Sequence, residues 1–186
     1  MIGAKELKAV TDLERSRFPT GRFVKPAGPL DSAARAACIA AIERAPRDIR
    51  ALVEGLSAAQ LDTPYRPGGW TIRQVTHHVP DSHINAYVRF KLALTEDAPT
   101  IKPYNEAEWA KLSDVSEVPV TVSLNLLDAV HTRWLAILRA MTEADFLRTF
   151  NHPELGPLAL YDALALYAWH GRHHTAHIEQ GLGIKN

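Results

Sequence analysis

Apolar side chains recur with helical spacing along much of the sequence, and this periodicity constrains the fold most strongly. It is clearest between Ile72 and Ala93, where apolar residues follow one another at steps of three, four and seven. Such steps place them on one face of an α-helix. Thr71 and Gln74 match a capping box directly before the run. A long helix is therefore predicted from Thr71 to about Glu96, with an inward face formed by Ile72, Val75, Val79, Ala86, Phe90 and Ala93.

Three further stretches share the helical pattern. The first, Ser32 to about Leu56, follows the N-cap candidate Asp31 and contains Pro46, which is expected to break or kink it. The others are Ser123–Met141 and Tyr161–Gln180. Four helical runs of roughly twenty residues with little strand signal predict an all-α four-helix bundle. In the third run, the inward face is predicted to contain Leu126, Leu127, Val130, Trp134, Ile137 and Leu138.

Residues 1–186 are expected to form one domain, because 186 residues suit a single generous core. Turn signals in residues 1–29 indicate an irregular arm laid over the bundle. Phe146–Leu158, with two prolines and a glycine, is expected to form a small hairpin before the last helix.

Charge and cysteine content limit the classes of function. Lys plus Arg and Asp plus Glu each number 21, so the formal net charge is zero. A neutral chain lacks the electrostatic footprint of a nucleic-acid-binding protein. The longest stretch without a charged residue, Val118–Leu127, is far shorter than the ~20 residues of a membrane span. With a single cysteine, Cys38, and a charged segment Met1–Leu13, the sequence favours a cytoplasmic protein with no membrane partner.

Histidine is the unusual residue here: the chain has nine, and four of them lie within Trp169–His177. On a helix, residues four apart lie ~6 Å from each other, so His170 with His174, or His173 with His177, could bind one metal ion. At ~100° per residue, His174 lies about 40° and His170 about 80° from the centre of the inward arc. The same rule places His177 about 100° and His173 about 140° away, so the first pair faces the interior better.

The predicted helix after Thr71 offers a third ligand. His78 lies on the flank of its apolar face, His77 projects further away, and His83 falls near the middle, as a core or supporting histidine would. Three histidines with an open fourth position are typical of a catalytic zinc-like site. Such a site could lower the pKa of a bound water molecule to about 7, or it could hold a thiol as thiolate, and the spacing does not choose between the two. It also leaves open that these histidines only pack or hydrogen-bond.

Several separated motifs match one known family. Gly68–His78 (GGWTIRQVTHH), followed by Asp81–His83 (DSH), resembles the DinB-like superfamily, and within it the YfiT-like branch of metal-dependent hydrolases and bacillithiol S-transferases. The further matching stretches, in the expected order over nearly the whole chain, are Phe18–Gly21, Gln60–Tyr65, Tyr87–Glu96, Lys102–Tyr104 and Tyr167–Ile178.

The resemblance implies a four-helix bundle with one divalent metal ion, nickel or zinc, bound by His78, His170 and His174. It also implies a homodimer. One departure from the family pattern is Pro80, two residues after His78. Because proline removes a helical hydrogen bond, we expect a kink there with the ligand retained.

The function expected from these observations is a metal-dependent thiol S-transferase or hydrolase acting on a small molecule, with a metal-activated water or thiol as the nucleophile. The alternative is a non-catalytic, stress-associated metal-binding bundle. Candidate substrate-binding residues are Arg89, Tyr104 and Trp109, and candidates to support the ligands are His83, His177 and Asp81.

Overall fold

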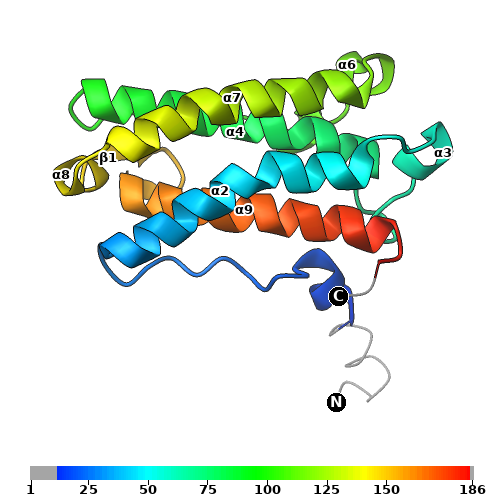
Figure 1. The fold of residues 1–186 in the computed structure, drawn as a ribbon, viewed down its shortest axis with the longest axis horizontal. Helices are drawn as coiled ribbons and strands as arrows, with labels where there is room; N and C mark the ends of the chain where they lie inside the picture. Colours follow the sequence, from blue (N-terminus) through cyan, green and yellow to red (C-terminus); the bar gives the residue numbers. More distant parts are fainter. Residues whose placement is uncertain (1–11, 185–186) are drawn as a thin grey trace.

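Four long helices form a bundle in the computed structural model, which describes residues 12–184 (Figure 1). The helices are α2 (Ser32–Val53), α4 (Ile72–Thr95), α7 (Val120–Ala140) and α9 (Leu160–Gly181). Both α2 and α4 pack against α7 and α9, so α2 and α4 lie diagonally opposite each other. The predicted four-helix bundle is confirmed.

Short elements connect the long helices. Helical residues also occur at 12–17, and the remaining elements are α3 (Ala58–Leu61), α5 (Glu106–Trp109), α6 (Ser113–Glu117), α8 (Glu143–Phe146), β1 (Thr149–His152) and β2 (Gly156–Ala159). The two strands pair antiparallel, Thr149 opposite Ala159 and His152 opposite Gly156, which confirms the small hairpin before α9. Pro46 does not break its helix, because α2 continues through it to Val53.

Local signals position the helix termini. The Thr71 side chain accepts a hydrogen bond from the Gln74 amide at 3.1 Å, and the Gln74 side chain accepts one from the Thr71 amide at 3.0 Å. This capping box starts α4, which carries the first candidate ligand. The Asp31 carboxylate caps α2 by accepting from the Ala34 amide at 2.7 Å. At the end of α9, Gly183 adopts φ +73°, a backbone conformation that glycine tolerates best.

The bundle core consists of two apolar clusters with a polar layer between them. One cluster surrounds Trp134 and Phe90, and the other surrounds Ile72 and Leu127. Both clusters include residues of α4, α7 and α9, and between them the inner face of each of these helices carries histidine. The polar layer thus forms where histidines replace apolar residues on the inner faces of α4, α7 and α9.

The inward face of α7 differs in part from the sequence prediction. Leu126 is 40% exposed, whereas Leu124 is buried and His131 lies in the buried stripe between Leu127 and Trp134. The prediction of Leu126 as a core residue was wrong. In a largely apolar helix, periodicity defines a broad arc, and the neighbours of α7 decide which side of that arc is covered.

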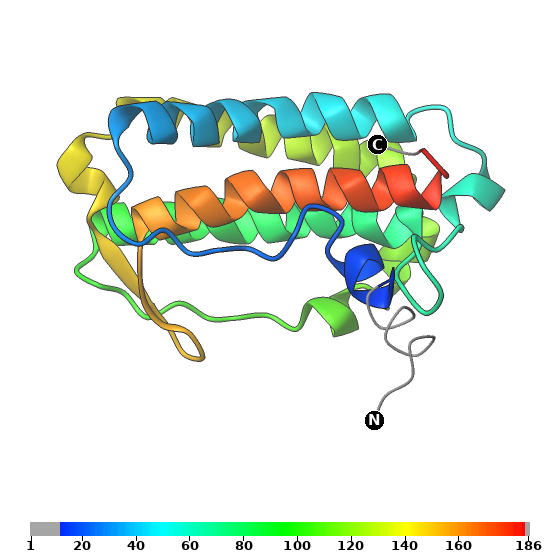
Figure 2. The ribbon, with the colours of Figure 1, turned by 90° about the horizontal axis from the view of Figure 1, so that it is seen from below.

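The N-terminal arm lies along α9, as Figure 2 shows for the blue segment beneath the orange and red helix. The Trp169 indole donates to the Gly21 carbonyl at 3.0 Å, and Lys25 pairs with the buried carboxylate of Asp162 at 3.1 Å. These contacts confirm an arm over the bundle. The arm is irregular from residue 18 to residue 29, but residues 12–17 are helical, so the prediction of irregular structure was wrong there. Residues 1–11 of the predicted arm lie outside the described part.

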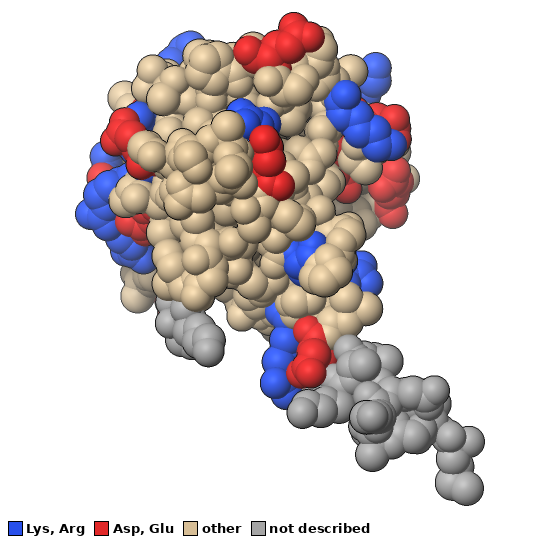
Figure 3. All heavy atoms as spheres, turned by 90° about the vertical axis from the view of Figure 1, so that its right-hand side faces the viewer, with Lys and Arg blue, Asp and Glu red and all other residues tan. Residues whose placement is uncertain are grey.

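Basic and acidic side chains lie close together around the bundle end seen in Figure 3, with no large area of a single sign. No helix within residues 12–184 is long and apolar enough to cross a membrane.

Candidate metal centre

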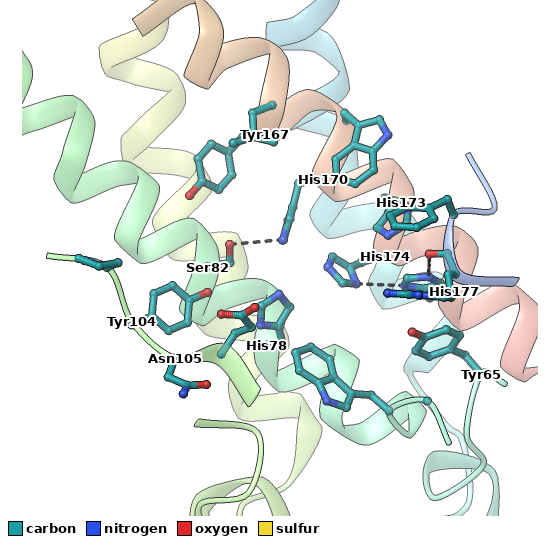
Figure 4. A pocket seen from close by; sticks show the side chains of 18 of the residues that line it. Tyr65, His78, Ser82, Tyr104, Asn105, Tyr167, His170, His173, His174 and His177 are labelled. Atoms are coloured by element: carbon teal, nitrogen blue, oxygen red, sulfur yellow. Dashed lines mark hydrogen bonds between the residues drawn. The ribbon is translucent and has the colours of Figure 1, made fainter. Parts of the chain in front are cut away.

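Three histidines from two helices converge in the interior of the bundle (Figure 4). His78 comes from α4, and His170 and His174 come from successive turns of α9. One ring nitrogen of each lies within 4.8 Å of the corresponding nitrogens of the other two. Among residues 12–184, these are the three residues that meet as a candidate metal-binding group. They are the same three that the sequence singled out.

The proline next to the first ligand does not turn that ligand away. Helix α4 runs without interruption from Ile72 to Thr95, with Pro80 inside it. The His78 ring centroid lies 4.9 Å from that of His174 and 5.4 Å from that of His170. The expected orientation of His78 is therefore present, and a kink at Pro80 stays a prediction.

Burial keeps these imidazoles uncharged. It lowers the pKa of His78 from its usual 6.5 to about 4, with a smaller contribution from His177. Burial also lowers the pKa of His170 and of His174 well below that value, and neighbouring histidines add to the effect. At neutral pH each side chain thus offers a lone pair instead of a positive charge.

The donor set suits a divalent transition-metal ion. Neutral imidazole is a ligand for zinc, copper, iron and nickel, whereas magnesium and calcium prefer oxygen. Histidine nitrogens are common zinc ligands, and three of them within 4.8 Å of one another could hold such an ion. Within residues 12–184 the group contains no fourth protein ligand.

A cavity of about 860 Å³ opens directly on the three histidines. Two of the substrate-binding candidates, Arg89 and Tyr104, line it. The Arg89 guanidinium donates to the Tyr167 hydroxyl at 3.3 Å, and among residues 12–184 no carboxylate forms an ion pair with it. Burial raises the pKa of the Tyr104 phenol above its usual range, so its hydroxyl keeps its proton at neutral pH.

Two sequence candidates lie outside this cavity. Trp109 is 39% exposed and packs on Tyr104, with ring centroids 4.5 Å apart, but it does not line the cavity wall. Asp81 is also absent from the wall, and within the described residues its carboxylate forms no hydrogen bond with a candidate ligand. Burial, followed by the charge of Asp114, raises its pKa to about 6. Trp109 therefore does not reach the cavity as a substrate-binding residue would, and Asp81 does not contact a candidate ligand as a supporting residue would.

The other two supporting candidates do contact the ligands. His83 is fully buried, and its Nε2 lies 3.1 Å from Nδ1 of His170. His177 Nδ1 lies 3.4 Å from Nδ1 of His174. Helical spacing placed His177 and His173 away from the interior, yet they are 3% and 6% exposed. The arm explains this burial, since the Phe18 ring stacks on His173 and the Arg17 carbonyl meets His177.

Some site residues were missed by sequence reasoning. Ser82 lines the cavity, with its hydroxyl 3.4 Å from Nε2 of His170. Its position four residues after His78 was a usable signal, because residues four apart share a helix face. His131 sits in the apolar stripe of α7, where an isolated histidine marks an internal polar contact. Tyr65 and Arg17 also line the cavity, but they come from loop and arm segments that no periodicity places.

Fold and site together define a class of protein: a four-helix bundle in which two helices present three histidines to an open cavity. A sequence model described as the DinB superfamily matches residues 41–178, and the chain belongs to this superfamily.

Two similar sequences carry a name that refers to metal-dependent hydrolysis. A "Putative metal-dependent hydrolase" of Bacillus mycoides (strain KBAB4) is 53% identical over 162 residues, covering 87% of this chain and 92% of the relative. A protein of the same name from Bacillus cereus (strain B4264) matches with the same identity and coverage.

Solved structures show the same fold. YfiT from Bacillus subtilis, described as a probable metal-dependent hydrolase with an unusual four-helix bundle topology, superimposes with a TM-score of 0.86. Its sequence is 40% identical, and the match covers 92% of this chain and 99% of YfiT. TT2238, a four-helix bundle protein, has a TM-score of 0.55 at 21% identity, with 76% of this chain and 95% of TT2238 covered, and supports the fold alone.

Proposed function

We propose that this protein is a metal-dependent enzyme in which His78, His170 and His174 bind one divalent ion, and that it acts on a small molecule as a thiol S-transferase or a hydrolase. The observation that supports this most directly is the position of the three imidazoles on the wall of an 860 Å³ cavity. An ion bound there would face the cavity with an open coordination position. As a Lewis acid, it would lower the pKa of a water molecule or a thiol.

The cavity wall indicates how a substrate would be held. Arg89 has no carboxylate partner within the described residues, so its guanidinium is available for a carboxylate or another anionic group of the substrate. The protonated hydroxyl of Tyr104 would donate a hydrogen bond beside it. Replacing Arg89 by glutamine should raise KM for a carboxylate-bearing substrate more than for its neutral ester.

The alternative function, a non-catalytic metal-binding bundle, requires a closed site. Its fourth ligand would come from the protein, and no space for a substrate would adjoin the metal. Within residues 12–184 the group has three ligands, and a cavity adjoins it. These observations favour the enzyme.

An activity screen tests the proposal. The protein, loaded in turn with zinc or nickel, is incubated with a chromogenic electrophile and each of several low-molecular-weight thiols, and a reaction without thiol measures hydrolysis. Thiol-dependent product formation identifies a transferase, and product formation by water alone identifies a hydrolase. No turnover above the His174→Ala control with any combination would contradict an enzymatic role.

Three finer points belong to the same proposal. The ion is nickel or zinc, which metal analysis of the purified protein tests. The chain forms a homodimer, as the family resemblance implies, which light scattering in solution tests. The enzyme works in the cytoplasm without a nucleic-acid partner, in keeping with a zero net charge and a single cysteine.

A further inference from the structure

A row of hydrogen-bonded histidines runs from the candidate ligand His170 into the bundle core. Nδ1 of His170 lies 3.1 Å from Nε2 of His83. Nδ1 of His83 lies 2.7 Å from Nε2 of His131, and Nδ1 of His131 lies 2.8 Å from the carbonyl oxygen of Ile42. The row thus crosses from α9 through α4 and α7 to α2, and it ends on a backbone group.

That backbone group determines the direction of every hydrogen bond in the row. A carbonyl oxygen can only accept, so Nδ1 of His131 carries its hydrogen. An uncharged imidazole has one N–H, and the Nε2 of His131 must therefore accept from Nδ1 of His83. By the same step, Nε2 of His83 accepts from Nδ1 of His170. This leaves Nε2 of His170 without a hydrogen, with its lone pair on the cavity side.

A shorter row supports the second ligand of α9. Nε2 of His177 lies 3.1 Å from the carbonyl oxygen of Arg17, in the N-terminal arm. His177 therefore donates through Nε2 and accepts through Nδ1, which lies 3.4 Å from Nδ1 of His174. His174 then carries its hydrogen on Nδ1 and its lone pair on Nε2. The same holds for His170, where the Ser82 hydroxyl lies 3.4 Å from Nε2 and can donate to that lone pair.

We propose that His83, His131 and His177 are positioning residues that hold His170 and His174 in the Nδ1–H tautomer, so that both direct an Nε2 lone pair at one metal ion. The inference rests on the proposed function, because it assigns these lone pairs to a metal. Partners of this kind orient metal-binding histidines in general. Here each acceptor is a neutral imidazole instead of a carboxylate, so the support adds no negative charge beside the ligands.

The tautomers can be measured directly by nitrogen-15 NMR of the metal-free protein. The expected result is a hydrogen on Nδ1 of His83, His131, His170 and His174. His177 differs, and its hydrogen is expected on Nε2. A hydrogen on Nε2 of either His170 or His174 would overturn the inference. This measurement needs no variant and no metal, so a wild-type protein that failed to bind zinc would contradict the proposed function separately.

Variants of His131 test whether the row affects metal affinity. His131→Leu removes the acceptor for His83, and we expect zinc to bind about 10–100-fold more weakly in competition with a chromophoric chelator. His131→Gln keeps both an amide donor and an acceptor oxygen, and it should restore most of the affinity. The matched control is His77→Leu, since His77 is a buried histidine of α4 that contacts Ser123 and lies outside both rows.

The outcomes separate positioning from simple core packing. A packing role predicts that leucine, which fills the space, binds zinc as well as the wild type does, and that result would overturn the inference. Equal weakening in His131→Leu and His77→Leu would overturn it as well. If His131→Leu fails to fold, the wild-type tautomers together with zinc binding by His131→Gln decide the question.

Discussion

The two candidate ligands on α9 are one helical turn apart, but different regions of the molecule support them. His170 contacts a row made by the bundle itself, in which His83 and His131 are 0% and 2% exposed. His174 contacts His177, whose other nitrogen meets a carbonyl of the N-terminal arm. The first support forms when the bundle packs, whereas the second also needs the arm to dock. One half of the site is thus part of the core, and the other half depends on a peripheral segment.

The largest expected effect is the loss of zinc binding when one of the two candidate ligands on α9 is replaced. His170→Ala and His174→Ala should each lose more affinity for zinc than the ~10–100-fold that loss of a supporting residue costs. We therefore expect the purified variants to contain almost no metal, measured by elemental analysis against the wild type. Full metal content in either variant would show that the assignment of that ligand is wrong.

A core substitution should destabilise the whole bundle. Trp134 is fully buried and packs against His83 and His131, with ring centroids 5.9 and 6.0 Å away. Trp134→Ala should lower the free energy of unfolding by about 3–5 kcal/mol, because it leaves a large cavity. Urea denaturation of the metal-free protein measures this, with the exposed Val122→Ala as the control.

Low pH should destabilise the metal-free protein through the buried histidine row that supports His170. Burial lowers the pKa of His131 from 6.5 to about 4, so between these values the unfolded chain binds a proton that the folded protein does not. The contribution of His131 to stability is therefore complete above about pH 6.5 and falls by a few kcal/mol as the pH decreases toward 4. The other buried histidines with lowered pKa values add to this loss. Asp81, with its pKa raised to about 6, opposes part of this loss. Urea denaturation at pH 7.5, 6 and 5 checks the direction, and a smaller pH slope is expected for His131→Gln.

Removing the N-terminal arm should change the pKa of His177, which supports His174, and leave the pKa of His131 unchanged. Burial lowers the pKa of His177 to about 4, while the Arg17 carbonyl opposes the shift and Arg66 adds to it. Tyr65 stacks on His177, and His173 and His174 lie beside it. Deleting residues 1–24 exposes His177, so its pKa should rise toward 6.5 while that of His131 stays near 4. An NMR titration of the two rings distinguishes them, and equal shifts would contradict a division between core and arm.

The smallest expected effect concerns the contact that fixes the arm near the start of α9. Lys25 pairs with the Asp162 carboxylate, and the two side chains are 52% and 4% exposed. Lys25→Met should cost about 1 kcal/mol, since half of the pair is exposed to water. The control is Lys111→Met, whose pair with Glu108 is exposed on both sides and should contribute less. Thermal unfolding compares the two, and an equal effect would show that the buried carboxylate of Asp162 does not depend on Lys25.

The sequence by itself determined the helices and the candidate ligand pair on the last helix. Apolar periodicity, the Thr71–Gln74 capping box and the four-residue spacing of His170 and His174 are local features, and local backbone geometry converts them directly into structure. The family motif added His78, and the structure brings these three side chains together.

Only the tertiary structure decided which helix faces are covered and by what. Spacing placed His173 and His177 away from the interior. They are buried because residues of the arm, 153 and 160 positions earlier in the sequence, lie over them. The partners of His131, the exposure of Leu126 and the contribution of Arg17 to the cavity follow from the same kind of remote packing. Periodicity describes one helix at a time, and a contact between distant segments depends on both surfaces at once. The orientation of the candidate metal-binding histidines therefore depends on packing between distant segments and not on the motif alone.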